Sequence, residues 1–279
     1  ENTTLANTSG ILKWALYLNP EWSTKLSLAK TKYGSDHNSI LINNSLNLNE
    51  YEQSVYEENT FTDEILTIYQ NIKSIKNHHL QLGYSHSTFN SDFNTQRILN
   101  ESSEETRLVQ KASLRSIFLE DKWAISKNIK LRLGIRNTYF SKNNSSYLEP
   151  RISATMKVTP NFIFEGALGK NNQFIHQFNS PLSTRGTQGT WLISQEKIPV
   201  VSSFSSQISS HWREHNHEYS ISLYQRSSEG HFNFEKYLSP IPILSEQNES
   251  GNPYYTESQG KEKINGAEVL IRRKNSLIN

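Results

Sequence analysis

The chain has 279 residues, of which 34% are hydrophobic and 11% aromatic, and it contains no cysteine. This composition excludes disulfide frameworks and thiolate metal sites, and its 29 basic and 27 acidic residues offer no argument for a nucleic-acid partner. No run of 18 or more apolar residues occurs, which excludes a membrane-spanning helix. Spanning strands are not excluded, because they alternate and give no hydropathy peak.

Apolar and polar residues alternate along many short segments, and this period of two predicts strands rather than helices. The clearest alternation, in chain order, covers residues 12–18, 22–28, 80–84, 129–139, 151–158, 162–168 and 219–223. Mixed or shorter alternation covers residues 65–72, 114–125, 204–212 and 264–273. We therefore predict an all-β chain of about eleven antiparallel strands.

Short and long links between these segments also alternate. Residues that favour turns form tight links near Asn19-Pro20 and at 76–77, 126–128, 159–161, 214–216 and 274–275. Longer polar links cover 36–61, 90–107, 173–203 and 235–262, and the short link at 141–147 is the exception. Short turns at one end and long loops at the other are typical of outer-membrane barrels. The pattern predicts an up-and-down transmembrane β-barrel.

Aromatic residues gather near both ends of the predicted strands. One group lies near the tight turns and comprises Trp22, Trp123, Phe162, Trp212 and Tyr219. The other lies near the opposite ends and comprises Tyr33, Tyr84, Tyr139, Tyr224 and Phe234. Two belts of amphipathic rings on either side of an apolar band are what a bilayer favours.

In two segments the alternation predicts which side chains contact lipid and which line the lumen. In residues 129–139 and 151–158 one face is apolar and is predicted to contact lipid through Leu131, Leu133, Ile135, Ile152 and Met156. The other face is predicted to line a wet lumen with Lys130, Arg132, Arg136 and Arg151. In hydrocarbon every backbone polar group must be paired around a closed barrel. About eleven strands with two open edges do not close one, so we expect the chain to be a piece of a larger barrel.

The segment "SYLEPRISATMKVTPNFIFEGALGKNNQFIHQF" (146–178) resembles the barrel of TonB-dependent outer-membrane receptors, especially those of Bacteroidetes type. The Leu-Glu-Pro-Arg motif at 148–151 is its most specific part. Residues 117–140 and 260–274 are similar to a preceding hairpin and a later strand of that family. The resemblance implies an interior section of a 22-stranded barrel, about strands seven to seventeen. Residues 1–279 would then all belong to the barrel, with the plug domain and the terminal strands absent from this chain.

For function, the resemblance implies active uptake of a scarce siderophore, cobalamin or glycan across a Gram-negative outer membrane, driven by TonB through the missing plug region. The expected partners are outer-membrane lipids, the small-molecule or glycan substrate and, as in some members, a surface lipoprotein, with no nucleic acid and no cofactor. Aromatic, arginine and amide side chains suit such ligands. We predict substrate contacts in the link at 173–203, at Gln173, His176, Gln177, Arg185 and Trp191.

No catalytic constellation stands out, and we do not expect an enzyme. His211, His215 and His217 would lie on different faces of a strand, turn and strand, so no metal site is predicted. Two other functions stay open. One is a porin-like or adhesion barrel without a plug. The other is a soluble all-β carbohydrate-binding protein, in which the same leucines and isoleucines would lie between two stacked sheets.

Overall fold

The computed structural model describes residues 2–43, 51–73, 75–99, 102–179, 189–195, 198–236 and 255–273. Within these ranges the chain forms thirteen strands. They are β1 (Asn2–Asn19), β2 (Trp22–Asn43), β3 (Tyr51–Ile72), β4 (His78–Leu99), β5 (Ser102–Ala124), β6 (Ile129–Phe140), β7 (Ser145–Thr159), β8 (Phe162–Gln173), β9 (Ile175–Asn179), β10 (Gly189–Ile193), β11 (Val201–Glu214), β12 (His217–Lys236) and β13 (Tyr255–Arg273). In this described part of the chain, no helix is long and apolar enough to cross a membrane.

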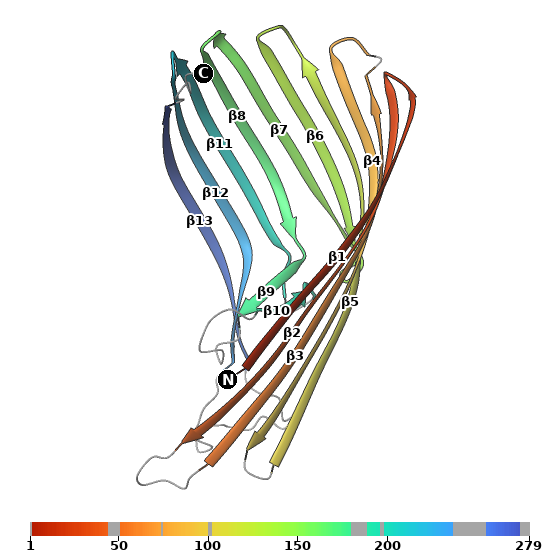
Figure 1. Cartoon of the computed structure of the whole chain (residues 1–279), viewed down its shortest axis with the longest axis vertical. Coiled ribbons are helices and arrows are strands. Elements are labelled where there is room, and N and C mark those ends of the chain that lie inside the picture. Colours follow the sequence, from red (N-terminus) through yellow and green to blue (C-terminus); the bar gives the residue numbers. More distant parts are fainter. Residues whose placement is uncertain are drawn as a thin grey trace, which may run out of the picture.

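Eleven of the strands form one antiparallel sheet in the order β1-β2-β3-β4-β5-β6-β7-β8-β11-β12-β13. Each strand pairs with the next one along the chain, except that β8 pairs with β11. The sheet curls into an open trough, and the two-stranded pair β9–β10 crosses its concave side (Figure 1). The all-β class and the eleven predicted strands are confirmed, since each predicted segment falls within one strand of this sheet, apart from Ile125 just after β5.

Strands β2 to β5 are longer than the sequence pattern predicts. They run for 22 or 23 residues, whereas about 9 to 11 residues cross a bilayer. The long loops predicted at 36–61 and 90–107 are therefore largely wrong, because most of these residues lie in paired strands. Their two faces are both polar, as at Asp36 and His37 or Glu57 and Glu58, so no alternation marks them as strand.

The two faces of the sheet differ in chemistry. The side chain of Phe61 packs against Trp191 of β10, so the odd-numbered residues of β3 lie on the concave face. Following the register across the sheet places the large apolar residues of the predicted band on the convex face. Many are well exposed, such as Leu12 at 68%, Leu133 at 40% and Ile221 at 50%. Among the described residues no second layer covers this face, so these side chains do not form the interior of a sandwich.

The predicted aromatic belts are only partly correct. Near the tight turns, all five predicted rings lie on the convex face, where Trp212 packs 5.4 Å from Tyr219. At the opposite ends Tyr84 and Tyr139 also lie on the convex face, but Tyr33 and Tyr224 lie on the concave face.

Contacts on the concave side explain both exceptions. The Tyr33 ring meets the edge of Trp191 at 6.0 Å. The Tyr224 ring lies over Gly266, where a Cβ atom would collide with it. The side chain of Phe234 lies outside the described part of the chain.

Candidate functional site

The site predicted in the link at 173–203 is a small hairpin inside the trough. Strands β9 and β10 pair antiparallel, with Gln177 opposite Trp191, His176 opposite Leu192 and Ile175 opposite Ile193. The hairpin packs against the concave face of β3, β4 and β5. This long-range contact, not local sequence, determines where the predicted site residues lie.

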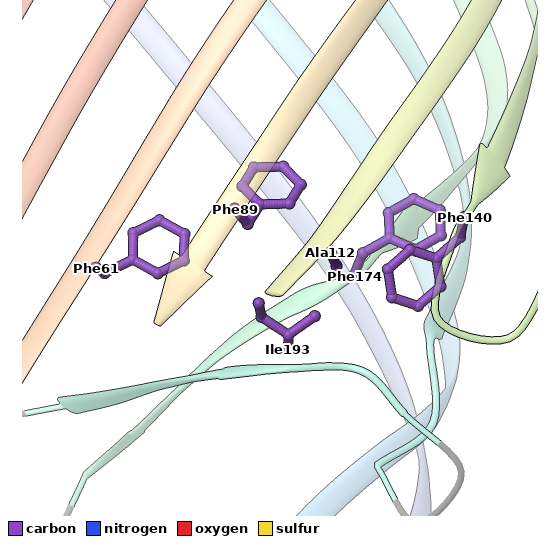
Figure 2. Packing of buried hydrophobic residues seen from close by; sticks show 6 residues of the cluster. All are labelled: Phe61, Phe89, Ala112, Phe140, Phe174 and Ile193. Carbon is purple, nitrogen blue, oxygen red and sulfur yellow. The ribbon is translucent and has the colours of Figure 1, made fainter. Parts of the chain in front are cut away.

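An apolar cluster holds the hairpin against the wall. Its buried members come from five strands and from the β8–β9 link, and Figure 2 shows how they converge. We call them the hairpin cluster: Phe61, Phe89, Ala112, Phe140, Phe174 and Ile193. Ile193 and Phe140 are fully buried, so removing either side chain leaves a cavity.

Aromatic stacking extends this cluster along the wall. The ring of Trp191 stacks on Phe61 at 5.1 Å with an interplanar angle of 27°. Phe174 packs 5.0 Å from Phe140 and meets Tyr147 edge-on at 5.1 Å. Such pairs contribute about 0.5–1.5 kcal/mol each beyond the area that they bury. Trp191 and Phe174 therefore anchor the two ends of the hairpin.

Two hydrogen bonds join the backbone of β10 to the wall. Ser91 Oγ of β4 donates to the carbonyl of Trp191 at 2.6 Å, and Gln110 Oε1 of β5 accepts from the amide of Ile193 at 3.0 Å. A third bond closes the hairpin itself, because the amide of Ser194 donates to the carbonyl of Phe174 at 2.8 Å. A buried backbone group without a partner is costly, so the first two contacts fix the position of β10 on the wall.

His176 lies on the opposite face of the hairpin and is 7% exposed. His176 Nε2 lies 2.8 Å from Ser194 Oγ, which donates to the carbonyl of Pro199 at 3.2 Å. Burial lowers the pKa of His176. The ring is therefore neutral at pH 7 and is held by Ser194 inside the hairpin.

The structure places the predicted substrate residues as follows. His176, Gln177 and Trp191 lie on one hairpin, but His176 is buried and Trp191 is wedged against the wall, while Gln177 is exposed. Gln173 is also exposed at the end of β8, and its Nε2 donates to the carbonyl of Ile175 at 2.8 Å. Arg185 lies outside the described residues. Substrate contact at these residues stays a prediction.

The wall residues that hold the hairpin were missed in the sequence. Phe61 and Phe89 carry a signal, because each lies on the strand face opposite to the leucines of its own apolar run, such as Leu66 and Leu82. Ser91 and Gln110 carry none, since polar residues on a concave barrel face are ordinary.

The predicted lumen-facing cations lie together on the concave face of β6 and β7. Arg132 Nη2 is 2.8 Å from Glu120 Oε2, and the Arg136 guanidinium lies 5.4 Å from the centre of the Phe118 ring. Arg151 Nη2 donates to Asn171 Oδ1 at 2.9 Å. The predicted lipid-facing residues of the same strands lie on the convex face. Contact of either face with lipid or water stays a prediction.

The Leu-Glu-Pro-Arg motif has a structural role. Glu149 is 5% exposed, and its Oε1 accepts hydrogen bonds from the backbone N of Asn172 at 2.8 Å and from Asn172 Nδ2 at 3.3 Å. This carboxylate therefore ties β7 to the end of β8, directly before the hairpin. In the described residues no group of three or more His, Cys, Asp or Glu side chains could hold a metal ion.

A curled antiparallel sheet with an apolar convex face, a polar concave face and an inward hairpin is a section of β-barrel wall. Residues 2–272 match the family model for the TonB dependent receptor-like β-barrel, and the chain belongs to this family. A search of curated protein sequences finds no match.

Solved structures of receptors share the fold. Pseudomonas aeruginosa FpvA bound to pyoverdine is 11% identical with a TM-score of 0.64, over 96% of this chain and 38% of that chain. The ferric yersiniabactin uptake receptor FyuA of Yersinia pestis is 9% identical with a TM-score of 0.62, over 98% and 44%. The RagAB peptide transporter is 12% identical with a TM-score of 0.59, over 98% and 34%. The chain spans less than half the length of each of these three relatives, and identities this low show the fold alone.

Proposed function

We propose that this chain is part of the barrel wall of an outer-membrane receptor that takes up a scarce substrate into a Gram-negative cell with energy from TonB. The exposed apolar band on the convex face carries this proposal. Contact of such a large apolar surface with water is unfavourable, whereas contact with the hydrocarbon of a bilayer is not. Membership of the receptor family supports the active-uptake part. TonB would act through a plug region outside this chain.

The inward hairpin supports selective uptake over unselective flow. It crosses the concave side of the wall and is anchored by the hairpin cluster and by backbone hydrogen bonds to β4 and β5. A lumen narrowed by a fixed element selects among ligands, whereas a porin keeps a water-filled channel. The hairpin is thus the part of this chain that we expect a passing substrate to meet.

Substrate contacts are proposed at exposed residues of this hairpin and next to it. Gln173 and Gln177 are exposed and offer amide donors and acceptors, and the half-buried Trp191 offers an apolar surface. His176 has a positioning role, because its imidazole is buried within the hairpin. A siderophore, cobalamin or glycan can use such groups, and the names of the similar structures add peptides to this range.

The long hairpins formed by β2 with β3 and by β4 with β5 suggest a docking place for a further partner. These strands continue well past the apolar band. A surface lipoprotein, if one accompanies the receptor, would meet them first.

The proposal is tested by following uptake in cells that carry the full-length receptor. Labelled ferric siderophore, cobalamin, oligosaccharide and peptide are compared in wild-type, receptor-deleted and TonB-deleted strains. We expect one class of substrate to lose uptake in both deletions. Uptake that persists without TonB, together with steady conductance of the purified protein in planar bilayers, would indicate a passive pore instead.

A matched pair of variants tests the hairpin contacts. Gln177→Ala removes an exposed amide from the hairpin, while Gln225→Ala removes one from the convex face of β12. We expect weaker substrate binding only for the first variant. Equal affinities for both would remove Gln177 from the site.

A further inference from the structure

A hollow of about 540 Å³ lies on the outside of the sheet over β1 to β4. Eight of its eleven lining residues lie on the convex face, where they align across the strands in two neighbouring rows. One row is formed by Leu12, Leu28, Leu66 and His86, and the row nearer the loop end is formed by Gly10, Lys30, Glu64 and Thr88. The hollow therefore lies where the apolar band ends.

A glycine keeps this hollow open. Gly10 lies in the same row as Lys30 and Glu64, and a Cβ atom added there would have no other atom within 4 Å. The position is thus free of side chains from β1. The leucines remain accessible next to the charged groups, which makes the hollow amphipathic.

On the convex face, basic residues lie in the rows next to the hollow, where they favour an anion. Three neighbouring rows of paired residues cross the end of the band, and they pass through Leu28, Lys30 and Lys32 of β2. The charged residues in these rows are four cations and one carboxylate: Lys30, Lys32, Lys111, Arg115 and Glu64. Lys30 Nζ is 2.6 Å from Glu64 Oε1, but its side chain is 66% exposed and can also reach outward. The other three cations form no ion pair within the described residues.

The next two rows toward the loop end reverse this sign. They carry Asp36, Glu58 and Asp92 with one cation, Arg107. Asp92 is already engaged, because Arg107 donates to both of its carboxylate oxygens, at 3.0 and 2.6 Å. The basic layer is therefore narrow and follows the edge of the apolar band.

Basic residues also follow the edge of the band on the other half of the sheet. There the convex face carries the uncharged Ser206, Gln225 and Asn265, and the next row toward the loop end carries Lys170 and Lys263. What distinguishes the basic residues of β2 is the hollow beside them, where they adjoin accessible leucines.

We propose that this hollow binds a phosphate-bearing membrane lipid, with an acyl chain against the three leucines and the headgroup phosphate among the lysines. This inference depends on the proposed outer-membrane location. Lysine side chains next to an apolar surface extend their ammonium groups to the headgroup layer, and each basic residue near an anionic lipid surface strengthens binding about fivefold.

The test uses the purified full-length receptor and two lipids that differ in charge. Binding of phosphatidylglycerol and of phosphatidylcholine is measured by native mass spectrometry in detergent. We expect phosphatidylglycerol to be retained more strongly, with a loss of roughly fivefold for Lys32→Ala and roughly 25-fold for the Lys30→Ala, Lys32→Ala double variant. Lys130→Ala, on the concave face, controls for net charge and should bind as the wild type does. Millimolar inorganic phosphate should not compete.

A second pair of variants tests the hollow itself. Gly10→Phe fills it, whereas Gly34→Phe places the same ring on the convex face two rows further toward the loop end, and neither position has neighbouring atoms to clash with. We expect reduced lipid retention for Gly10→Phe alone.

Equal retention of the two lipids, equal effects in both glycine variants, or competition by free phosphate would overturn the lipid site. Failure of the receptor to insert into vesicles of either lipid would instead contradict the proposed membrane location.

Discussion

The docking of the β9–β10 hairpin gives a quantitative prediction for Trp191→Ala. The indole stacks on Phe61 at 5.1 Å and meets Tyr33 edge-on at 6.0 Å, which together contribute about 1–3 kcal/mol beyond burial. Full burial of a tryptophan makes its removal cost about 3–5 kcal/mol, but this one is only half-buried. We therefore expect docking to weaken by about 2–3 kcal/mol, so the undocked population rises roughly 30- to 150-fold.

Hydrogen exchange of the hairpin amides measures this change. The amide of Ile193 donates to Gln110 in the docked state, so it exchanges only when the hairpin leaves the wall. The matched control is Gln177→Ala, because Gln177 pairs with Trp191 and its side chain is exposed. We expect faster exchange at Ile193 for Trp191→Ala and an unchanged rate for the control. Equal rates in both variants would refute the assignment of Trp191 as the anchor.

Three further predictions concern stability. Gly83→Ala places a Cβ atom against an aromatic ring of β5 and 2.7 Å from a side-chain carbon of β3. Overpacking of this kind costs about 1–3 kcal/mol, so the folded yield in detergent should fall, while Gly34→Ala, with no neighbour within 4 Å, should leave it unchanged. Glu149→Ala leaves a β8 amide without its acceptor and should lower the free energy of unfolding in urea by about 1–3 kcal/mol; a loss below 0.5 kcal/mol would contradict a structural role. Burial lowers the pKa of His176 within the folded hairpin, so the unfolded hairpin binds the proton first and the hairpin should become less stable as pH falls below about 6.5. Hydrogen exchange measured from pH 7.5 to 5.5, corrected for intrinsic rates, should lose this dependence in His176→Gln.

The sequence predicts the strands within the apolar band because one face there is restricted to apolar residues. Leu131, Leu133 and Ile135 alternate with Lys130 and Arg132, and the register places the two sets on opposite faces. No comparable restriction acts on the outer halves of β2 to β5. Polar side chains on both faces of a strand give no periodic signal. The pairing of residues such as Asp36 with Glu58 could therefore not be predicted from the sequence.

The candidate site was predictable only as a region. The link at 173–203 contains the hairpin, but the contacts that place it join residues far apart in the chain, such as Ser91 and Trp191, which are separated by 100 positions. Periodicity reports the face on which a side chain lies and not its tertiary partner. The sequence therefore could not distinguish the buried His176 from the exposed Gln177.

The most direct measurement compares the surroundings of two neighbouring residues on β6. Because this chain has no cysteine, single spin labels are attached at Leu133→Cys and Arg132→Cys in the receptor reconstituted into vesicles. We expect the label at 133 to collide mainly with oxygen dissolved in the bilayer and the label at 132 to collide mainly with a water-soluble nickel complex. Access of the nickel complex to the label at 133, or equal access to both labels, would contradict a convex face that lies against hydrocarbon.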